Sequence, residues 1–276
     1  MSFHTIVLHL DGGASTATRT ELAIGLAREH GSHLIGLAPT GEVEAPLEFG
    51  ASLVDPGYLV ATRHYLRQCA TRLCEAFDAK AAEAQLSSYE SRVTEGGHAA
   101  SVMALARAAD LAVIGQTDID APADGVEVDL PEQVALGSGR PVLVVPYTGR
   151  FQIPGRQVLA AWNDSREAAH AFAGALPLLQ RAHKLTVMTH RAPNAQPIAT
   201  QDLAAWLHRQ GVKSPRFADE AAQIGVGDLL LSRAADLDID LIVMGAWGQS
   251  RLKEWALGGA TRSLLQQMTV PVLMAH

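Results

Sequence analysis

Cysteine is nearly absent from this sequence, which has 276 residues and two cysteines. Cys69 and Cys74 lie five positions apart in a helix-like segment, where their side chains diverge, so the sequence predicts no disulfide between them. Metal-ligand spacings are also missing, because the eleven histidines include no His-x3-His pair and the cysteines form no Cys-x2-Cys pair. With 48% hydrophobic residues, the chain can bury its cores without disulfides or a metal.

Excess positive charge and long apolar runs are missing as well. The formal net charge is -7 and the isoelectric point is about 5.9, which argues against a nucleic-acid partner, because phosphate backbones are bound by basic faces. No run approaches the roughly 18 apolar residues of a membrane span, and residues 1–5 lack the charged start of a signal peptide. The sequence therefore predicts a soluble, cytoplasmic protein that binds neither nucleic acid nor membranes.

Common catalytic motifs are not found either. The chain has no Gly-x-Ser-x-Gly elbow and no Gly-x4-Gly-Lys-Ser/Thr loop, so it lacks the nucleophile of one enzyme class and the lysine of the other. Gly225 and Gly227 start like a dinucleotide-binding fingerprint, but Leu230 stands where the third glycine belongs. We expect no dedicated enzyme.

What the chain does contain is an internal repeat. Residues 110–115 match residues 240–245, and residues 140–143 match residues 270–273, at a constant offset of 130. The first strands align at an offset of 152, with Asp11 opposite Asn163, so the first half carries about 22 extra residues by subtraction (152 - 130). These extra residues fall between 39 and 70. The repeat predicts two domains, 1–148 and 154–276.

Strands and helices alternate in each half. Short apolar runs alternate with segments whose apolar residues recur every three or four positions, which is the pattern of α/β folds with a parallel sheet and helices on both faces. The predicted strands are 5–11, 33–37, 90–94, 111–114, 141–145, 158–162, 185–189, 215–218, 240–244 and 270–275. The predicted helices are 20–30, 58–85, 99–109, 166–181, 203–210 and 228–236.

The most informative segment follows the strand at 240–244. Gly245 and Gly248 are followed, nine residues later, by Gly258 and Gly259 at the start of a helix-like segment. Glycines let the backbone approach a phosphate, and the free amides and dipole of a helix start attract anions. Thr261 can add a hydroxyl. The same glycines also fit plain turns and a helix entry, and the tryptophans nearby, Trp247 and Trp255, also fit packing roles.

In open parallel sheets, ligands bind at the carboxyl ends of strands where the connections diverge. In the second half these are the ends of strands 158–162 and 240–244. The predicted site residues are Ala161, Trp162, Asn163, Met244, Gly245, Trp247, Gly248, Gly258, Gly259, Ala260 and Thr261. Trp162 fits an adenine neighbour and a core residue equally well.

The two halves differ in charge at this position. Residues 245–262 contain Arg251, Lys253, Glu254 and Arg262, a net charge of +2. The matching residues 115–132 contain six acids and no base, a net charge of -6. At an effective dielectric constant of about 20, two like charges roughly 4 Å apart repel by about 4 kcal/mol. Acids around a triphosphate therefore oppose binding, and we expect one nucleotide site, in the second half. The acids themselves fit a solvated face better than a cation site.

These segments together resemble the universal stress protein family in tandem form. The resemblance rests on four features: a first strand followed by an acid, Asp-Leu-Ile-Val-Met-Gly at 240–245, the Gly-x2-Gly-x9-Gly spacing and the final Pro-Val-Leu at 271–273. It covers both halves of the chain. It implies two Rossmann-like, five-stranded parallel sheets of the adenine-nucleotide α-hydrolase type. It also implies pairing of the last strands, 142–146 and 270–275, which would protect two exposed edges.

The resemblance implies ATP, with or without magnesium, as the ligand, and a regulatory or protective role in the stress response with at most slow hydrolysis. Two residues depart from the family pattern: Gly259 replaces a Ser, Thr or Asn, and Asn163 replaces an acid. Loss of one hydroxyl contact costs about 0.5–1.5 kcal/mol. The alternatives are a nucleotide-free interaction module, whose partner surface is the acidic first-half loop and the helix at 58–85, and a hydrolase, for which no base is found. A homodimer beyond the tandem pair stays open.

Overall fold

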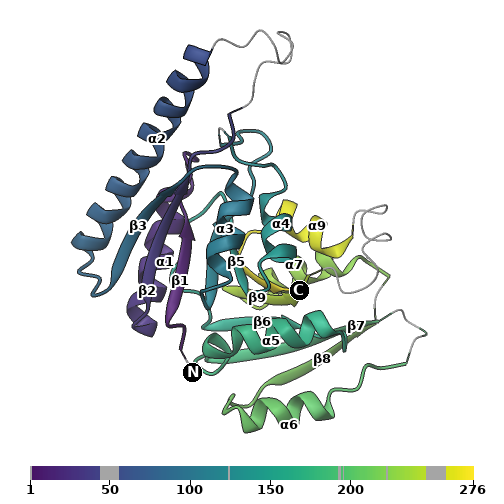
Figure 1. The fold of residues 1–276 in the computed structure, drawn as a ribbon. Helices are drawn as coiled ribbons and strands as arrows, with labels where there is room; N and C mark the ends of the chain where they lie inside the picture. Colours follow the sequence, from purple (N-terminus) through teal and green to yellow (C-terminus); the bar gives the residue numbers. More distant parts are fainter. Residues whose placement is uncertain are drawn as a thin grey trace.

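Ten strands form one continuous sheet in the computed structural model, which describes residues 2–43, 56–123, 125–191, 194, 196–221, 223–246 and 259–276. The strand order is β3-β2-β1-β4-β5-β10-β9-β6-β7-β8 (Figure 1). The strands of the first half are β1 (Thr5–His9), β2 (His33–Pro39), β3 (Tyr89–Thr94), β4 (Leu111–Gly115) and β5 (Val142–Val145). Those of the second half are β6 (Gln157–Ala161), β7 (Lys184–Arg191), β8 (Arg216–Ala221), β9 (Leu241–Gly245) and β10 (Val272–Ala275).

The two halves join through their last strands. Within each half all neighbouring strands are parallel, whereas β5 and β10 run antiparallel, with Leu143 opposite Leu273. All side chains of both strands are buried, with at most 4% exposed. The expected α/β fold, with two five-stranded sheets paired through their final strands, is confirmed.

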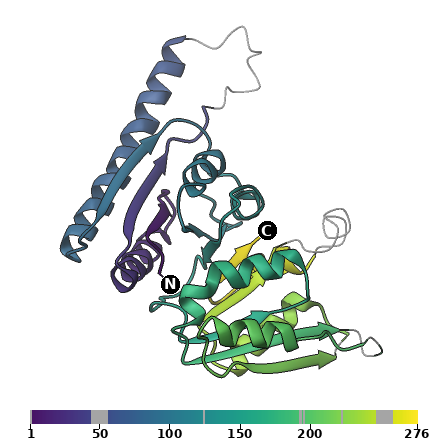
Figure 2. The same cartoon turned by 60° about the horizontal axis from the view of Figure 1, so that its bottom comes forward.

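Helices cover both faces of the sheet (Figures 1 and 2). One face packs against α1 (Thr16–His30), α2 (Pro56–Glu83), α5 (Arg166–Leu179) and α6 (Gln201–Arg209). The other face packs against α3 (His98–Ala106), α4 (Leu130–Gly137), α7 (Val226–Asp236) and α9 (Ala260–Gln267). None of the helices in the described ranges is long and apolar enough to cross a membrane.

The extra residues of the first half lie where the sequence predicted them. Helix α2 has 28 residues and packs against β2 and β3 with its second half, where Ala70, Cys74 and Phe77 are buried. The rest of the insertion, residues 44–55, lies outside the described residues. Cys69 and Cys74 are both free thiols, as their spacing predicted.

Candidate functional site

Each half has one place where the connections diverge to opposite faces of the sheet. After β1 the chain enters α1 on one face, and after the neighbouring β4 it enters α4 on the other. The same holds for β6 with α5 and β9 with α9. In open α/β sheets such a switch point leaves a crevice at the carboxyl ends of the strands. The structure thus has two candidate sites, related by the repeat.

The first-half crevice is a pocket of about 280 Å³. Its walls come from the β1–α1 loop, from the end of β4 and from the start of α4. Asp11 lies at its edge and is 7% exposed. The Asp11 carboxylate accepts hydrogen bonds from Gly13 N at 2.9 Å, from Thr16 Oγ1 and from Arg19 Nη2 at 2.8 Å. The Asp11 carboxylate therefore places a negative charge of the protein itself in the β1–α1 turn, just before α1.

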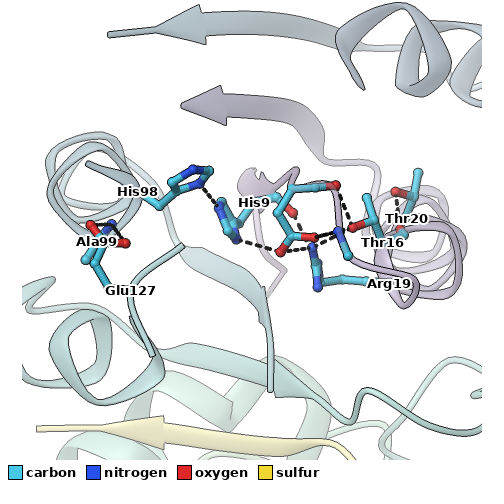
Figure 3. Close-up of polar contacts among 9 residues, drawn as sticks. His9, Thr16, Arg19, Thr20, His98, Ala99 and Glu127 are labelled. Carbon is cyan, nitrogen blue, oxygen red and sulfur yellow. Dashed lines mark hydrogen bonds and ion pairs between the residues drawn. The ribbon is translucent and has the colours of Figure 1, made fainter. Parts of the chain in front are cut away.

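Arg19 lines this crevice, and Figure 3 shows its side chain beside Thr16 and His9. It is 1% exposed, and its Nε donates to the carbonyl oxygen of His9 at 3.1 Å. Gly115, at the end of β4, faces the guanidinium so closely that a side chain there would overlap it. Burial alone would raise the pKa of Asp11, but the charge of Arg19, with smaller contributions from His9 and Thr16, holds it well below its usual value.

A pair of buried histidines extends the cluster toward α3 (Figure 3). His9 Nε2 and His98 Nδ1 are 2.8 Å apart, and His9 Nδ1 is 3.5 Å from Asp11 Oδ2. Burial lowers the pKa of His9 to about 3, against the attraction of Asp11, and burial also lowers the pKa of His98. Both rings are therefore neutral at pH 7, and one donates to the other.

Two carboxylates on the remaining wall are also used inside the protein. Glu127 accepts from the backbone N–H of Ala99, in the first turn of α3, at 3.3 Å. Asp118 Oδ1 accepts from the backbone N–H groups of Asp120 and Ala121 at 3.1 and 3.2 Å. Within the described residues no three His, Cys, Asp or Glu side chains are grouped to hold a metal ion. The first-half crevice is therefore internally satisfied and predominantly acidic.

At the end of β6, in the second half, the described residues form no ion pair like that of Asp11 with Arg19. Ala161 is the last residue of β6, and the backbone N–H of Trp162 donates to Met188 O at 2.8 Å. The Trp162 ring packs edge-on against Phe172, with 5.4 Å between centroids. Its Nε1 is buried without a hydrogen-bond partner among the described residues, which leaves one donor unused.

Asn163 stands where the first half has Asp11. Its Oδ1 accepts from Ser165 N at 3.3 Å and from Ser165 Oγ at 2.6 Å, and Ser165 Oγ in turn accepts from Ala168 N at 3.1 Å. The neutral Asn163 thus organises the start of α5 through Ser165 rather than through a charge. Glu167, a buried carboxylate in the first turn of α5, pairs with Arg166 at 2.8 Å.

Met244 and Gly245 end β9 beside β6. Met244 is 5% exposed and belongs to the core. A Cβ on Gly245 would lie 2.5 Å from Ala168 N and 2.6 Å from the carbonyl carbon of Glu167, so glycine is required for α5 to pack this closely. Both residues thus have a packing role, and their predicted nucleotide contacts stay a prediction.

The start of α9 lies where the sequence predicted a helix. Ala260 is its first residue, and Gly259 precedes it with φ -54° and ψ 162°, accepting from Arg262 N at 3.0 Å. Thr261 is 2% exposed. Trp247, Gly248 and Gly258 lie outside the described residues, so the glycine loop itself stays a prediction.

Sequence reasoning missed the buried cluster of the first half, although the repeat contains a signal for it. His98 starts α3 after Gly97, whereas Val226 starts α7 after Gly225. His9 ends β1, whereas Ala161 ends β6. Two histidines replace two apolar residues at matching positions, which suggests that they face each other.

The comparisons with known proteins agree with this fold. Residues 155–276 match the model of the universal stress protein family. A universal stress protein structure from Archaeoglobus fulgidus DSM 4304 is similar over 98% of this chain and 95% of that chain, with 13% identity and a TM-score of 0.67. A structure of a functionally unknown protein from Pseudomonas aeruginosa PAO1 is similar over 99% and 92%, with 16% identity and a TM-score of 0.58. No curated protein matches the sequence significantly.

Proposed function

We propose that this chain binds an adenine nucleotide in its second half and acts as a switch or protective factor in the stress response, because residues 155–276 match the model of the universal stress protein family. ATP, with or without magnesium, is the ligand that the sequence pattern favours. The proposed contacts are the glycine loop at 245–259 and the ends of β6 and β9. The division into domains 1–148 and 154–276 belongs to the same proposal.

The difference between the two strand ends carries this proposal. In the first half the Asp11 carboxylate lies at the end of β1, paired with Arg19. In the second half Asn163 leaves the matching position without charge. A polyphosphate meets no carboxylate at the position of Asn163, so its charge is not opposed there.

Described residues offer suitable donors for the nucleotide. The unused Nε1–H of Trp162 is buried at the end of β6 and can donate to a base or ribose oxygen. Gly259 precedes α9, whose N-terminus favours an anion. We expect at most slow hydrolysis, because the sequence contains none of the common hydrolase motifs.

A nucleotide-free interaction module is the second candidate. The exposed residues of α2 and of the acidic loop favour it, because surfaces with exposed apolar groups often bind partners. Titration calorimetry with ATP separates the two candidates. Absence of heat at millimolar ATP would rule out the first.

A charge reversal in the loop gives the sharpest test of the nucleotide site. Gly248→Asp places in the second loop the residue that the first loop has at Asp118, 130 positions earlier. We expect at least a tenfold loss of ATP affinity, about 1.4 kcal/mol, by repulsion of the phosphates, with an unchanged circular dichroism spectrum.

The matched control is Asp118→Gly, the reverse change in the first half. It removes one carboxylate at the internally satisfied crevice and leaves the second half as it is. We expect its ATP affinity to equal that of the wild type. If Gly248→Asp binds ATP as well as the wild type, or if Asp118→Gly changes the affinity more, the proposed site is wrong.

A further inference from the structure

Helix α2 is longer than the sheet edge that it covers. Its 28 residues span about 42 Å, whereas the six residues of β3 span about 20 Å. Counted from Gly57, Ala70 is the first buried residue of the helix, so the turns before it extend beyond the sheet (Figure 1). The segment 57–74 is therefore largely a solvent-exposed surface.

The exposed side of this segment, which continues past the overhang to residue 72, is basic and apolar. Residues 57–74 contain three arginines, Arg63, Arg67 and Arg72, and no acid, although the whole chain has a net charge of -7. Tyr58 is 47% exposed and Val60 67% exposed. We name this segment the basic face of α2.

A second surface has the opposite charge. The described residues of the loop 117–129 include four acids, Asp118, Asp120, Glu127 and Asp129, and no basic residue. Ile119 and Val128 in the same loop are 62% and 61% exposed. We name it the acidic loop. Of eight large hydrophobic residues exposed in the described part of the chain, five lie in these two segments, with Tyr65 as the fifth. Such concentration is typical of interaction surfaces.

Both surfaces lie at the same end of the molecule. Arg67 of α2 pairs with Glu95 at 3.2 Å, and the adjacent Gly96 forms a bridge with Gly41. Gly41 in turn packs against Gly125 of the acidic loop, since a Cβ on Gly41 would lie 3.3 Å from Gly125 O. A short series of contacts thus connects the two surfaces along one edge.

From this arrangement we propose that the chain forms a two-fold homodimer in which the basic face of α2 docks on the acidic loop of a second copy. A two-fold axis between the surfaces repeats the contact, so each copy supplies one basic and one acidic partner. The charges are complementary, and the exposed apolar residues on both sides are removed from water together. The acidic net charge of the chain disfavours an anionic membrane as the occupant.

The test uses charge reversals at exposed positions, followed by sedimentation velocity at low salt. One variant carries Arg63→Glu and Arg72→Glu, which leaves the Arg67–Glu95 pair intact, and the other carries Asp120→Lys and Asp129→Lys. Each contact of the homodimer is repulsive in either variant, so we expect both to be monomers, with dimer dissociation constants raised at least tenfold. Circular dichroism and melting temperature check that both variants fold.

Mixing the two variants distinguishes this dimer from any other. In the mixed pair, the acidified α2 of one variant meets the basic loop of the other. The second contact joins an unchanged α2 to an unchanged acidic loop, so both contacts are attractive. We expect a 1:1 mixture to form a heterodimer, and 1 M salt, where the screening length is about 3 Å, to weaken the wild-type dimer. The proposal is overturned if the wild type stays monomeric at about 100 μM, a concentration well above micromolar dissociation constants. It is also overturned if the mixture of the two variants stays monomeric.

Discussion

At the scale of single residues, the buried pair of Asp11 and Arg19 sets the first half apart. Both side chains are at least nine-tenths buried, and Arg19 contacts both the carboxylate and the backbone of the strand end. A buried ion pair has a large desolvation cost, so it contributes little net stability while it is intact. Removing one partner is different, because the other charge then stays buried without compensation.

We therefore expect Arg19→Met to lower the free energy of unfolding by about 3–5 kcal/mol. The double variant Asp11→Asn/Arg19→Met should recover much of this loss, since it leaves no buried charge. Urea denaturation at pH 7 measures both effects. A loss below about 1 kcal/mol in Arg19→Met would contradict the buried pair.

The buried histidines make stability depend on pH. The pKa of His9 is about 3 in the folded protein, against 6.5 for an exposed histidine, so the unfolded chain takes up the proton first as the pH falls. Stability from His9 is complete above pH 6.5 and is lost between pH 6.5 and 3. Asp11, whose pKa is also lowered, acts with the same sign below its unfolded pKa of 3.8.

Between about pH 6.5 and 4.5 we expect His9 alone to lower the free energy of unfolding by about 2–3 kcal/mol, because each pH unit contributes about 1.4 kcal/mol. His98 and His30, whose pKa values burial also lowers, add to this loss. His9→Gln should have a smaller slope than the wild type in urea denaturation across this range. Equal slopes would show that His9 is not a buried neutral ring.

At the scale of the elements, the sequence predicted what local patterns and the repeat determine. The repeat offset of 130 predicted that β4 corresponds to β9 and that β5 corresponds to β10. The apolar periodicity predicted both ends of α2 to within two residues. The short α4 was missed, because its segment begins with Leu130, Pro131 and Glu132 after an acidic stretch and shows little helical periodicity. Its position follows from the matching helix α9.

The site was predicted less completely, for a physical reason. The pair His9–His98 joins residues 89 positions apart, and no local pattern connects them. Gly245 is predicted to contact a phosphate, which stays a prediction, and the structure also gives it a packing role against the first turn of α5. A glycine that admits a ligand and one that admits a helix look the same in a sequence.

At the scale of the whole molecule, the continuous sheet ties the two halves together. Besides the pairing of β5 with β10, the side chain of Gln116 crosses between the halves. Its Nε2 donates to Leu265 O at 2.8 Å and to Gln266 O at 3.2 Å, and its Oε1 accepts from Tyr147 N at 3.1 Å. Arg181 of the second half pairs with Glu29 of the first. Neither half can lose its last strand without exposing the edge of the other.

The last prediction concerns this coupling. We expect a single calorimetric transition for the wild type, with equal calorimetric and van't Hoff enthalpies, because the buried β5–β10 edge belongs to both halves. Gln116→Leu roughly keeps the side-chain volume but removes the hydrogen-bond partner of the Leu265 carbonyl and of the Tyr147 N–H. We expect it to lower the free energy of unfolding by about 1–3 kcal/mol. The melting temperature should fall by about 2–10 °C while the transition stays single. Two resolved transitions in the wild type would mean that the halves unfold independently and that the shared strand pair does not couple them.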